Sequence, residues 1–124
     1  MYISCKIAED QDIQIEQETY TEDEKHYLCR FCNGMITSAA ERITVNESHT
    51  HIFSNPHGFV FEIGCFKGAK GCFYFGEPSI EFAWFAGYSW QIAGCRSCKN
   101  HLGWYFSSES DFFFGLILDR LVFM

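Results

Sequence analysis

Residues 95–98 read Cys95-Arg-Ser-Cys98, and a matching pair, Cys29-Arg-Phe-Cys32, occurs earlier, with 62 residues between the two pairs. Two residues between thiols let both sulfurs reach one cation from a tight turn. Two such turns supply the four tetrahedral thiolates that Zn²⁺ prefers, at ~2.3 Å each. The spacing therefore predicts a structural Zn²⁺ on Cys29, Cys32, Cys95 and Cys98 that fastens distant parts of one domain. Because a four-sulfur site is closed, we do not expect this metal to be catalytic.

Two other uses of paired cysteines compete with a metal site. Disulfides are disfavoured by the odd count of seven cysteines and by the lack of a secretory signal, a basic start followed by an apolar stretch. A thioredoxin-like redox motif would occur once, near a βαβ pattern that this sequence lacks. The remaining cysteines, Cys5, Cys65 and Cys72, are interpreted as ordinary buried or surface residues.

Around the cysteines the chain reads as short strands between turns marked by glycine and asparagine, which predicts an all-β domain. Residues 59–63 and 71–75 have the aromatic and β-branched composition of strands. Alternation predicts two more strands at 80–85 and 102–106. Residues 112–123 fit either a final strand or a short helix, and we favour the strand.

The acidity of the chain belongs to its N-terminal segment. The net charge is −7, and residues 1–27 hold eight acidic residues against two lysines. We therefore divide the chain into an acidic segment, 1–26, and a folded domain, 27–124, which is long enough for one core. An acidic chain is poorly suited to neutralise phosphates, so nucleic acid is not an expected partner.

The sequence does not predict a membrane partner either. The longest charge-free stretch, 82–95, is interrupted by polar residues and glycine and falls short of the ~20 apolar residues that a spanning helix needs. The missing signal and the predicted thiolate site favour the cytoplasm, although the sequence does not settle the compartment.

All three tryptophans, Trp84, Trp90 and Trp104, fall on either side of the second cysteine pair. Aromatic residues usually form core, but tryptophan is rarely buried completely, so core and a binding pocket are both open. An aromatic box holds either a cation, through the ring quadrupoles, or a compact neutral ring. Alternation turns Glu81 away from Trp84, which favours the neutral ring because a cation would gain from an inward carboxylate.

Six motifs in this order resemble the CULT domain, the thalidomide-binding domain of cereblon, over residues 27–123. The resemblance implies a β-tent, in which two antiparallel sheets at a steep angle are pinned by four cysteines on zinc. The motifs are the two cysteine pairs, Asn55-Pro-His-Gly58, Gly76-Glu-Pro-Ser79, Glu81-Phe-Ala-Trp84-Phe-Ala-Gly-Tyr-Ser-Trp90 and His101-Leu-Gly-Trp104.

The same resemblance implies a ligand site. The three tryptophans would form a cage for cyclic imides such as glutarimide and thalidomide, for cyclic imides at protein C-termini, or for uracil-like and uridine-like rings. Phe106 would be a neighbouring aromatic, Asn55 would close one side, and the backbone at Phe82 and Trp84 would pair with the imide. Animal cereblons carry histidine where this chain has Phe82, so we expect binding weaker by ~0.5 to 1.5 kcal/mol, the contribution of one hydrogen bond.

The resemblance also bears on partners and on catalysis. Cereblon places this domain after a Lon domain and a helical segment that docks on a ubiquitin-ligase adaptor, and 124 residues leave no room for either, so we expect a free-standing module without that adaptor. Methionine sulfoxide reductases of the β-tent class need a nucleophilic thiol beyond the second cysteine pair, and no cysteine follows Cys98. We therefore do not expect an enzyme. A reader of methyl-lysine or quaternary amines remains the other binding alternative.

Overall fold

The computed structural model of the chain describes residues 24–124 and contains two antiparallel sheets. The predicted acidic segment lies almost wholly outside these residues. The small sheet has the order β10 (Leu121–Phe123), β2 (His26–Cys29), β3 (Met35–Ser38). The large sheet has the order β4 (Thr50–Ser54), β5 (Val60–Phe66), β9 (Phe112–Ile117), β8 (His101–Ser107), β7 (Ser89–Cys95), β6 (Cys72–Ser79).

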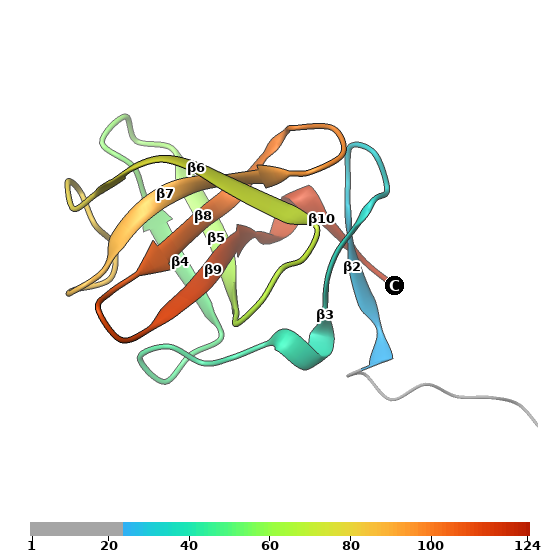
Figure 1. Ribbon diagram of the computed structural model, residues 1–124, viewed down its shortest axis with the longest axis horizontal. Coiled ribbons are helices and arrows are strands. Elements are labelled where there is room, and N and C mark those ends of the chain that lie inside the picture. The colour runs from blue at the N-terminus through green and yellow to red at the C-terminus, as the bar shows by residue number, and fades with distance from the viewer. Residues whose placement is uncertain (1–23) are drawn as a thin grey trace, which may run out of the picture.

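The predicted all-β fold of two antiparallel sheets is confirmed. β2 and β3 run steeply across the direction of β6, β7 and β8 (Figure 1). Two short 3-10 helices, η2 (Ala39–Glu41) and η3 (Leu118–Arg120), lie where the chain passes from one sheet to the other. No helix among residues 24–124 is long and apolar enough to cross a membrane.

The two sheets approach each other closely at Gly71. Its backbone N–H donates to the carbonyl oxygen of Ile36 at 2.9 Å, and a Cβ on Gly71 would overlap the carbonyl oxygen of Met35. Only glycine permits this approach. A buried cluster that includes Tyr27 and Leu116 fills the space between the sheets. This cluster supports the joint at which the cysteine pairs meet.

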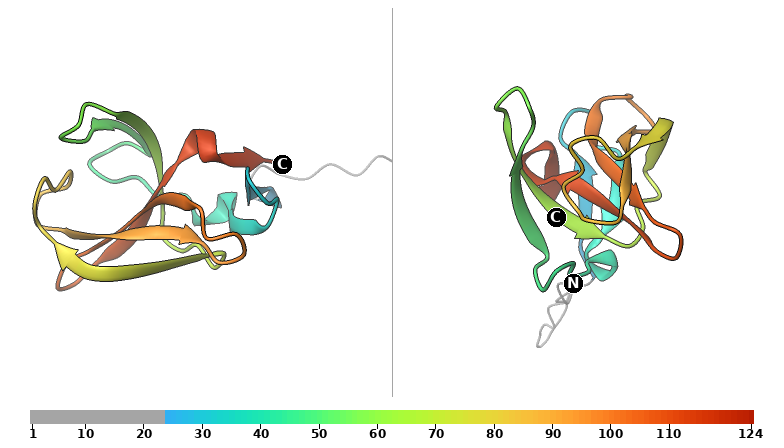
Figure 2. Two further views of the ribbon diagram at one scale, coloured as in Figure 1. Left: turned by 90° about the horizontal axis from the view of Figure 1, so that it is seen from above. Right: turned by 90° about the vertical axis from the view of Figure 1, so that its left-hand side faces the viewer.

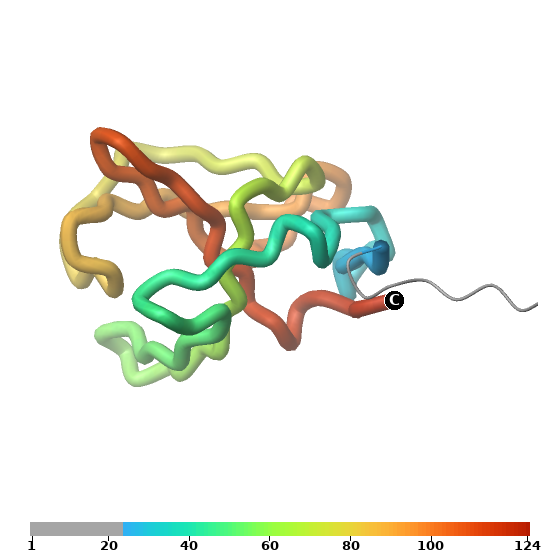
Figure 3. The backbone as a smooth tube through the Cα atoms, turned by 90° about the horizontal axis from the view of Figure 1, so that it is seen from below, coloured from blue at the N-terminus to red at the C-terminus, as the bar shows by residue number. Residues whose placement is uncertain are grey.

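A second buried cluster lies within the large sheet. Phe85, Phe106 and Phe113 pack edge-on or stacked at centroid distances of 4.9 to 5.1 Å. The connection from η2 to β4 runs along β5 and is tied to it by the N–H of Ile43, which donates to the carbonyl oxygen of Cys65 at 3.0 Å (Figure 3). Because the buried cluster also includes side chains of β4 and β5, it packs these two strands against β8 and β9.

The predicted strand at 80–85 is wrong, because β6 ends at Ser79 and the chain then turns through residues 80–88. Gly76 has φ +94° and Phe82 has φ +55°, values that break the extended backbone. Ile80 and Phe82 are 79% and 70% exposed, so they do not share an interior face with Trp84. The alternation argument for this segment therefore fails.

The final segment, 112–123, is strand for most of its length but not one strand. β9 pairs with β8 in the large sheet, and β10 pairs with β2 in the small sheet. The 3-10 turn of η3 between them redirects the chain from one sheet to the other. The preference for strand over helix is thus right for β9 and β10, while Leu118–Arg120 is helical.

Candidate functional site

The four predicted metal ligands come together at the joint between the sheets. The Sγ atoms of Cys29 and Cys98 lie 3.7 Å apart, those of Cys32 and Cys95 lie 3.6 Å apart, and all four lie within 4.8 Å of one another. Four sulfurs at ~2.3 Å from one tetrahedral ion are about 3.8 Å apart. Disulfide-bonded sulfurs are ~2.05 Å apart, so these cysteines are not bridged. The donor set fits a tetrahedral cation, as predicted.

The two cysteine pairs sit on turns of the same design. Cys29 ends β2 and its N–H donates to the carbonyl oxygen of Gly34 at 2.8 Å. Cys95 ends β7 and its N–H donates to the carbonyl oxygen of Asn100 at 2.9 Å. Asn33 and Lys99, one residue after each pair, have φ +65° and +70°. Both turns therefore curl back under the sulfurs.

Hydrogen bonds from Gly34 and Asn100 reach the sulfurs of Cys32 and Cys98. The N–H of Gly34 donates to Cys32 Sγ at 3.4 Å, and the Asn100 side-chain amide donates to Cys98 Sγ at 3.2 Å. The bond from Gly34 lowers the pKa of the Cys32 thiol, but desolvation and the contact with Cys95 outweigh it, so that this pKa is raised. Hydrogen bonds from Asn100 lower the pKa of the Cys98 thiol to about 6. Burial raises the pKa of the Cys29 thiol to about 12. Sequence reasoning did not identify Asn100, whose position two residues after Cys98 matches that of Gly34 after Cys32.

A cavity of about 520 Å³ is lined by the loop of the β4–β5 hairpin, by the 80–88 turn and by residues of β5, β7 and β8. The hairpin loop and the turn both lie at the end of the molecule away from the small sheet (Figure 2). Its size lies within the ~300 to 1,000 Å³ usual for small-molecule sites. Every residue predicted for the ligand site lines it, namely Trp84, Trp90, Trp104, Phe82, Phe106 and Asn55.

Trp84 and Trp104 form one corner of this cavity. Their rings meet edge to face, with centroids 4.7 Å apart and planes at 73°. Behind Trp84, Phe53 stacks in parallel at 4.8 Å, and the Trp84 indole N–H donates to the carbonyl oxygen of Ser54 at 3.3 Å. Both aromatic and polar contacts from β4 therefore fix the orientation of Trp84.

Trp90 and Trp104 stand on adjacent strands, β7 and β8. The Trp90 indole N–H donates to the carbonyl oxygen of Glu81 at 2.7 Å. Trp104 packs edge-on against the rings of Phe61 at 5.3 Å and His101 at 5.0 Å. Each tryptophan is thus held from behind by its neighbours while all three line the cavity.

Asn55 shapes the loop that borders the cavity. Its side-chain oxygen accepts hydrogen bonds from the N–H groups of His57 at 3.0 Å and Phe59 at 2.9 Å. Gly58 completes the turn with φ +88°, and the N–H of Gly58 donates to the Asn55 carbonyl oxygen at 3.0 Å. The Asn55 oxygen is therefore engaged within the loop, and its position beside the cavity is a consequence of that turn.

Two of the predicted site residues lie at the base and at the rim of the cavity. Phe106 is 2% exposed and packs on Phe85 and Phe113, so it supports the base of the cavity and is not an open wall. Phe82 stands at the rim, largely exposed. The predicted pairing of the Phe82 and Trp84 backbone with an imide stays a prediction.

Six further residues line the cavity that were not among the predicted site residues, namely Pro56, His57, Phe61, Glu81, Ile92 and His101. Glu81 was interpreted as turned away from the box on the strength of a strand that does not form. Phe61 follows Asn55 after a loop and reaches the cavity from β5, and no local motif indicates that. His101 belongs to the quoted His101-Leu-Gly-Trp104 motif, which was a usable signal.

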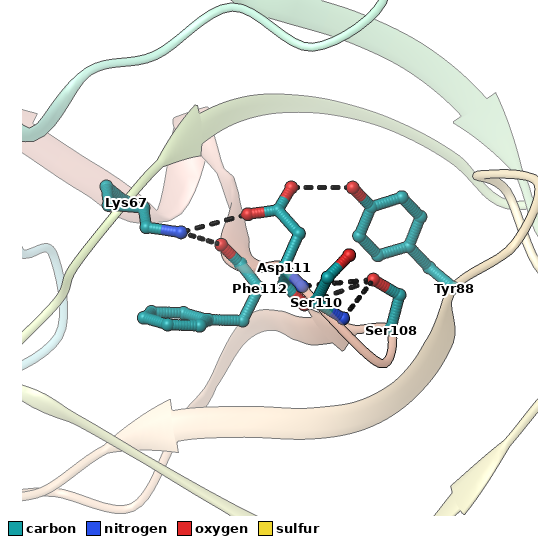
Figure 4. A network of polar contacts seen from close by, with 6 residues as sticks. All are labelled: Lys67, Tyr88, Ser108, Ser110, Asp111 and Phe112. Carbon is teal, nitrogen blue, oxygen red and sulfur yellow. Dashed lines mark hydrogen bonds and ion pairs between the residues drawn. The ribbon is translucent and has the colours of Figure 1, made fainter.

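A network on the outer side holds the 80–88 turn in place (Figure 4). The Tyr88 hydroxyl donates to Asp111 Oδ2 at 2.6 Å. The Lys67 ammonium contacts Asp111 Oδ1 at 3.0 Å and donates to the carbonyl oxygen of Phe112 at 2.8 Å. The turn that carries Trp84 is thereby tied to the β8–β9 turn and to the end of β5.

Comparison with known proteins agrees with this arrangement. The chain is 34% identical to protein cereblon of Drosophila erecta over 101 residues, which cover 77% of this chain and 17% of the relative. It is 32% identical to protein cereblon of Drosophila simulans over 114 residues, which cover 84% of this chain and 19% of the relative. The chain thus spans less than a fifth of the length of these curated relatives. No protein-family model matches the chain.

Proposed function

Because this chain belongs to the cereblon family through a CULT-type domain, we propose that its tryptophan-lined cavity binds cyclic imides. The ligands would be glutarimide-like and thalidomide-like rings, cyclic imides at the C-termini of proteins, or related uracil-like rings. The observation that carries the proposal is the convergence of Trp84, Trp90 and Trp104 on one open cavity. An imide ring presents CH₂ groups to the indole faces and keeps a polar edge for backbone partners.

The same proposal assigns Zn²⁺ to the four-cysteine cluster. Zn²⁺ takes four thiolates in closed tetrahedral sites, and the Sγ spacing of 3.6 to 3.7 Å suits that geometry. The metal would fasten β2 to the end of β7 and so support the joint between the sheets. Its role is structural, since four protein ligands leave no position for a substrate.

A quaternary-amine reader is the second candidate, because Glu81 lines the cavity. A carboxylate beside three indoles would add to the attraction of a cation, worth ~0.5 to 2 kcal/mol at each aromatic face.

The reductase alternative finds no support among the buried thiols. Burial raises the pKa of both Cys65 and Cys72 to about 12, whereas a nucleophilic cysteine requires a lowered pKa. Both side chains are also almost completely buried, at 0% and 3% exposed.

Titration of intrinsic tryptophan fluorescence tests the choice among these functions. We expect glutarimide to quench the emission in a saturable way and choline to have no effect, because the neutral ring fits the proposed cage. Saturable quenching by choline alone would assign the cavity to cations. Turnover of methionine sulfoxide with a dithiol reductant would assign the chain to the reductases. Ligand-free protein loaded with Zn²⁺, with the metal content measured, serves as the starting material for all three assays.

A further inference from the structure

Arg120 lies in η3, outside the cavity lining, yet it contacts both the cysteine turn and the groups behind the cavity. We propose that Arg120 is a positioning residue that joins the four-cysteine centre to the Trp104 wall of the cage. The proposal rests on the proposed function, since it concerns how the ligand site is held. Arg120 contacts the first cysteine turn through its backbone carbonyl oxygen, and it contacts His101 through its guanidinium.

On the metal side, the contact is made by backbone. The N–H of Arg30 donates to the carbonyl oxygen of Arg120 at 3.0 Å. Arg30 stands between Cys29 and Cys32, so this bond reaches the middle of the first cysteine turn. The next residue, Leu121, pairs with Cys29 in the register of β10 and β2. The position of η3 is therefore set by the turn that carries two of the metal ligands.

On the cage side, the guanidinium holds His101. Arg120 donates from one terminal nitrogen to the His101 carbonyl oxygen at 2.9 Å, and the same nitrogen lies 3.4 Å from His101 Nδ1. His101 Nε2 lies 2.9 Å from the carbonyl oxygen of Gly103, an acceptor only, so Nε2 carries the proton and Nδ1 faces the guanidinium as an acceptor. Burial, together with the charge of Arg120, lowers the pKa of His101 and keeps the ring neutral.

The imidazole of His101, fixed by these hydrogen bonds, packs against the indole ring of Trp104. The two rings meet edge to face at 5.0 Å and 87°. Since His101 also lines the cavity, a shift of its ring would change both the tilt of Trp104 and the space available to a ligand. Two polar contacts therefore hold this ring, one between Nε2 and Gly103 and one between Nδ1 and Arg120, while the second Arg120 contact holds the His101 backbone.

A second route runs through Phe61. The guanidinium carbon lies 5.9 Å from the centre of the Phe61 ring, within the ~6 Å range of cation–π attraction. Phe61 in turn packs against Trp104 at 5.3 Å and against Trp84 at 6.3 Å. One planar cation thus reaches two cage walls through two different rings. Lysine lacks the planar fork that such a double contact uses.

The test compares Arg120→Met with Arg30→Met. The control removes a positive charge from the first cysteine turn, while its contact with Arg120 uses the backbone N–H, which methionine retains. We expect Arg120→Met to weaken glutarimide binding between about 2- and 30-fold, the range seen for residues that couple sites without touching the ligand. Arg30→Met should bind as the wild type does, and both variants should hold the same amount of Zn²⁺.

Indole N–H signals in an NMR spectrum report on position without any ligand. The chain has three tryptophans, and a Trp104→Phe variant identifies the signal of Trp104. In Arg120→Met we expect this signal to move, while the Trp90 signal keeps its place because its partner is the Glu81 carbonyl oxygen. If the methionine variant does not fold, Arg120→Lys provides the same comparison, since it keeps the charge and loses the fork.

The outcomes separate this proposal from the proposed function. Wild-type protein that does not bind glutarimide would contradict the function, while the Trp104 signal would still decide the role of Arg120. An unmoved Trp104 signal in a folded Arg120 variant would overturn the inference, as would equal losses of affinity in the Arg120 and Arg30 variants.

Discussion

The carbonyl oxygen of Glu81 accepts a hydrogen bond from the indole nitrogen of Trp90 across 2.7 Å. This bond ties the 80–88 turn to β7, so the wall of the cavity and the turn beside it form one unit. It also engages the polar edge of Trp90 within the protein, as the bond to Ser54 does for Trp84. These two indoles therefore offer apolar faces to a ligand, and the polar partners of an imide must come from elsewhere.

We predict that Trp84→Ala and Trp104→Ala each weaken glutarimide binding by more than about 30-fold, the loss expected for tryptophans that dominate a contact. Isothermal titration calorimetry measures the affinity. The Zn²⁺ content should remain unchanged, because the four cysteines lie at the joint between the sheets and none of them lines the cavity. Phe75→Ala, which removes a 53% exposed ring outside the cavity lining, is the matched control. Loss of Zn²⁺ from both tryptophan variants would instead identify these residues as core.

We predict that Phe82→His strengthens glutarimide binding by about two- to tenfold, the effect of one added neutral hydrogen bond. Phe82 lines the cavity at the rim, where the resemblance to the CULT domain places a histidine. Its φ of +55° suits the change, since histidine adopts this region more readily than most residues. Phe82→Leu controls for loss of the ring. An equal affinity in wild type and the histidine variant would show that the side chain at 82 does not reach the ligand.

The four-cysteine cluster and six of the residues that line the cavity were predictable because short motifs carry them. Two Cys-x-x-Cys pairs specify both ligand identity and turn geometry, and the four ligands of one tetrahedral ion then require that the pairs meet. The three tryptophans follow from the same kind of local signal. The later comparison with cereblon relatives confirms the resemblance on which the cage was based.

The conformation of the 80–88 turn was not predictable, because contacts distant in sequence determine it. Ile80, Phe82 and Trp84 have the alternation of a strand. The chain turns instead, because the Trp90 indole N–H donates to the Glu81 carbonyl oxygen and Phe82 adopts a positive φ. The link from Arg120 to His101 spans 19 residues and two sheets, and no motif contains both. Local pattern thus predicts which residues take part, while tertiary contacts decide where their side chains point.

We predict that, after Zn²⁺ is chelated, Cys98 is the first cysteine of the described residues to be alkylated at pH 7. Hydrogen bonds from Asn100 lower its pKa to about 6, so the reactive thiolate is its main form at that pH. Burial raises the pKa of Cys65 and Cys72 to about 12, so both should react slowly. Mass spectrometry of iodoacetamide-treated peptides gives the order.

Two controls accompany the alkylation experiment. Protein loaded with Zn²⁺ should be protected at Cys98, since a metal-bound thiolate is a poor nucleophile. Asn100→Ala should slow the alkylation of Cys98 in the chelated protein, because its side-chain hydrogen bond to sulfur at 3.2 Å is lost. Equal rates at Cys98 and Cys65 would contradict the assignment of the low-pKa thiol.

The last prediction concerns the Tyr88–Asp111 contact that holds the turn beside Trp84 (Figure 4). The hydrogen bond from Tyr88, followed by that from Lys67, lowers the pKa of the Asp111 carboxyl. A lowered carboxyl pKa contributes stability that is present above the unfolded value of ~3.9 and is lost as the pH falls through the folded value. The same bond raises the pKa of Tyr88, so the contribution of Tyr88 is present below the unfolded value of ~10 and is lost as the pH rises through the folded value.

Asp111→Asn should therefore lower the melting temperature by a constant amount across neutral pH, by about 2 to 6 °C for one hydrogen bond and ion pair at a partly exposed site. The difference from wild type should begin to shrink below about pH 4, where the carboxyl of the unfolded chain becomes protonated, and should be lost as the pH falls through the lower folded value. Glu109→Gln, which removes a charge from the same β8–β9 turn, is the matched control. Thermal unfolding followed by circular dichroism measures both variants. A gap that persists unchanged at pH 3 would mean that the Asp111 charge does not stabilise the turn, and Tyr88 would then act through packing on Phe113 alone.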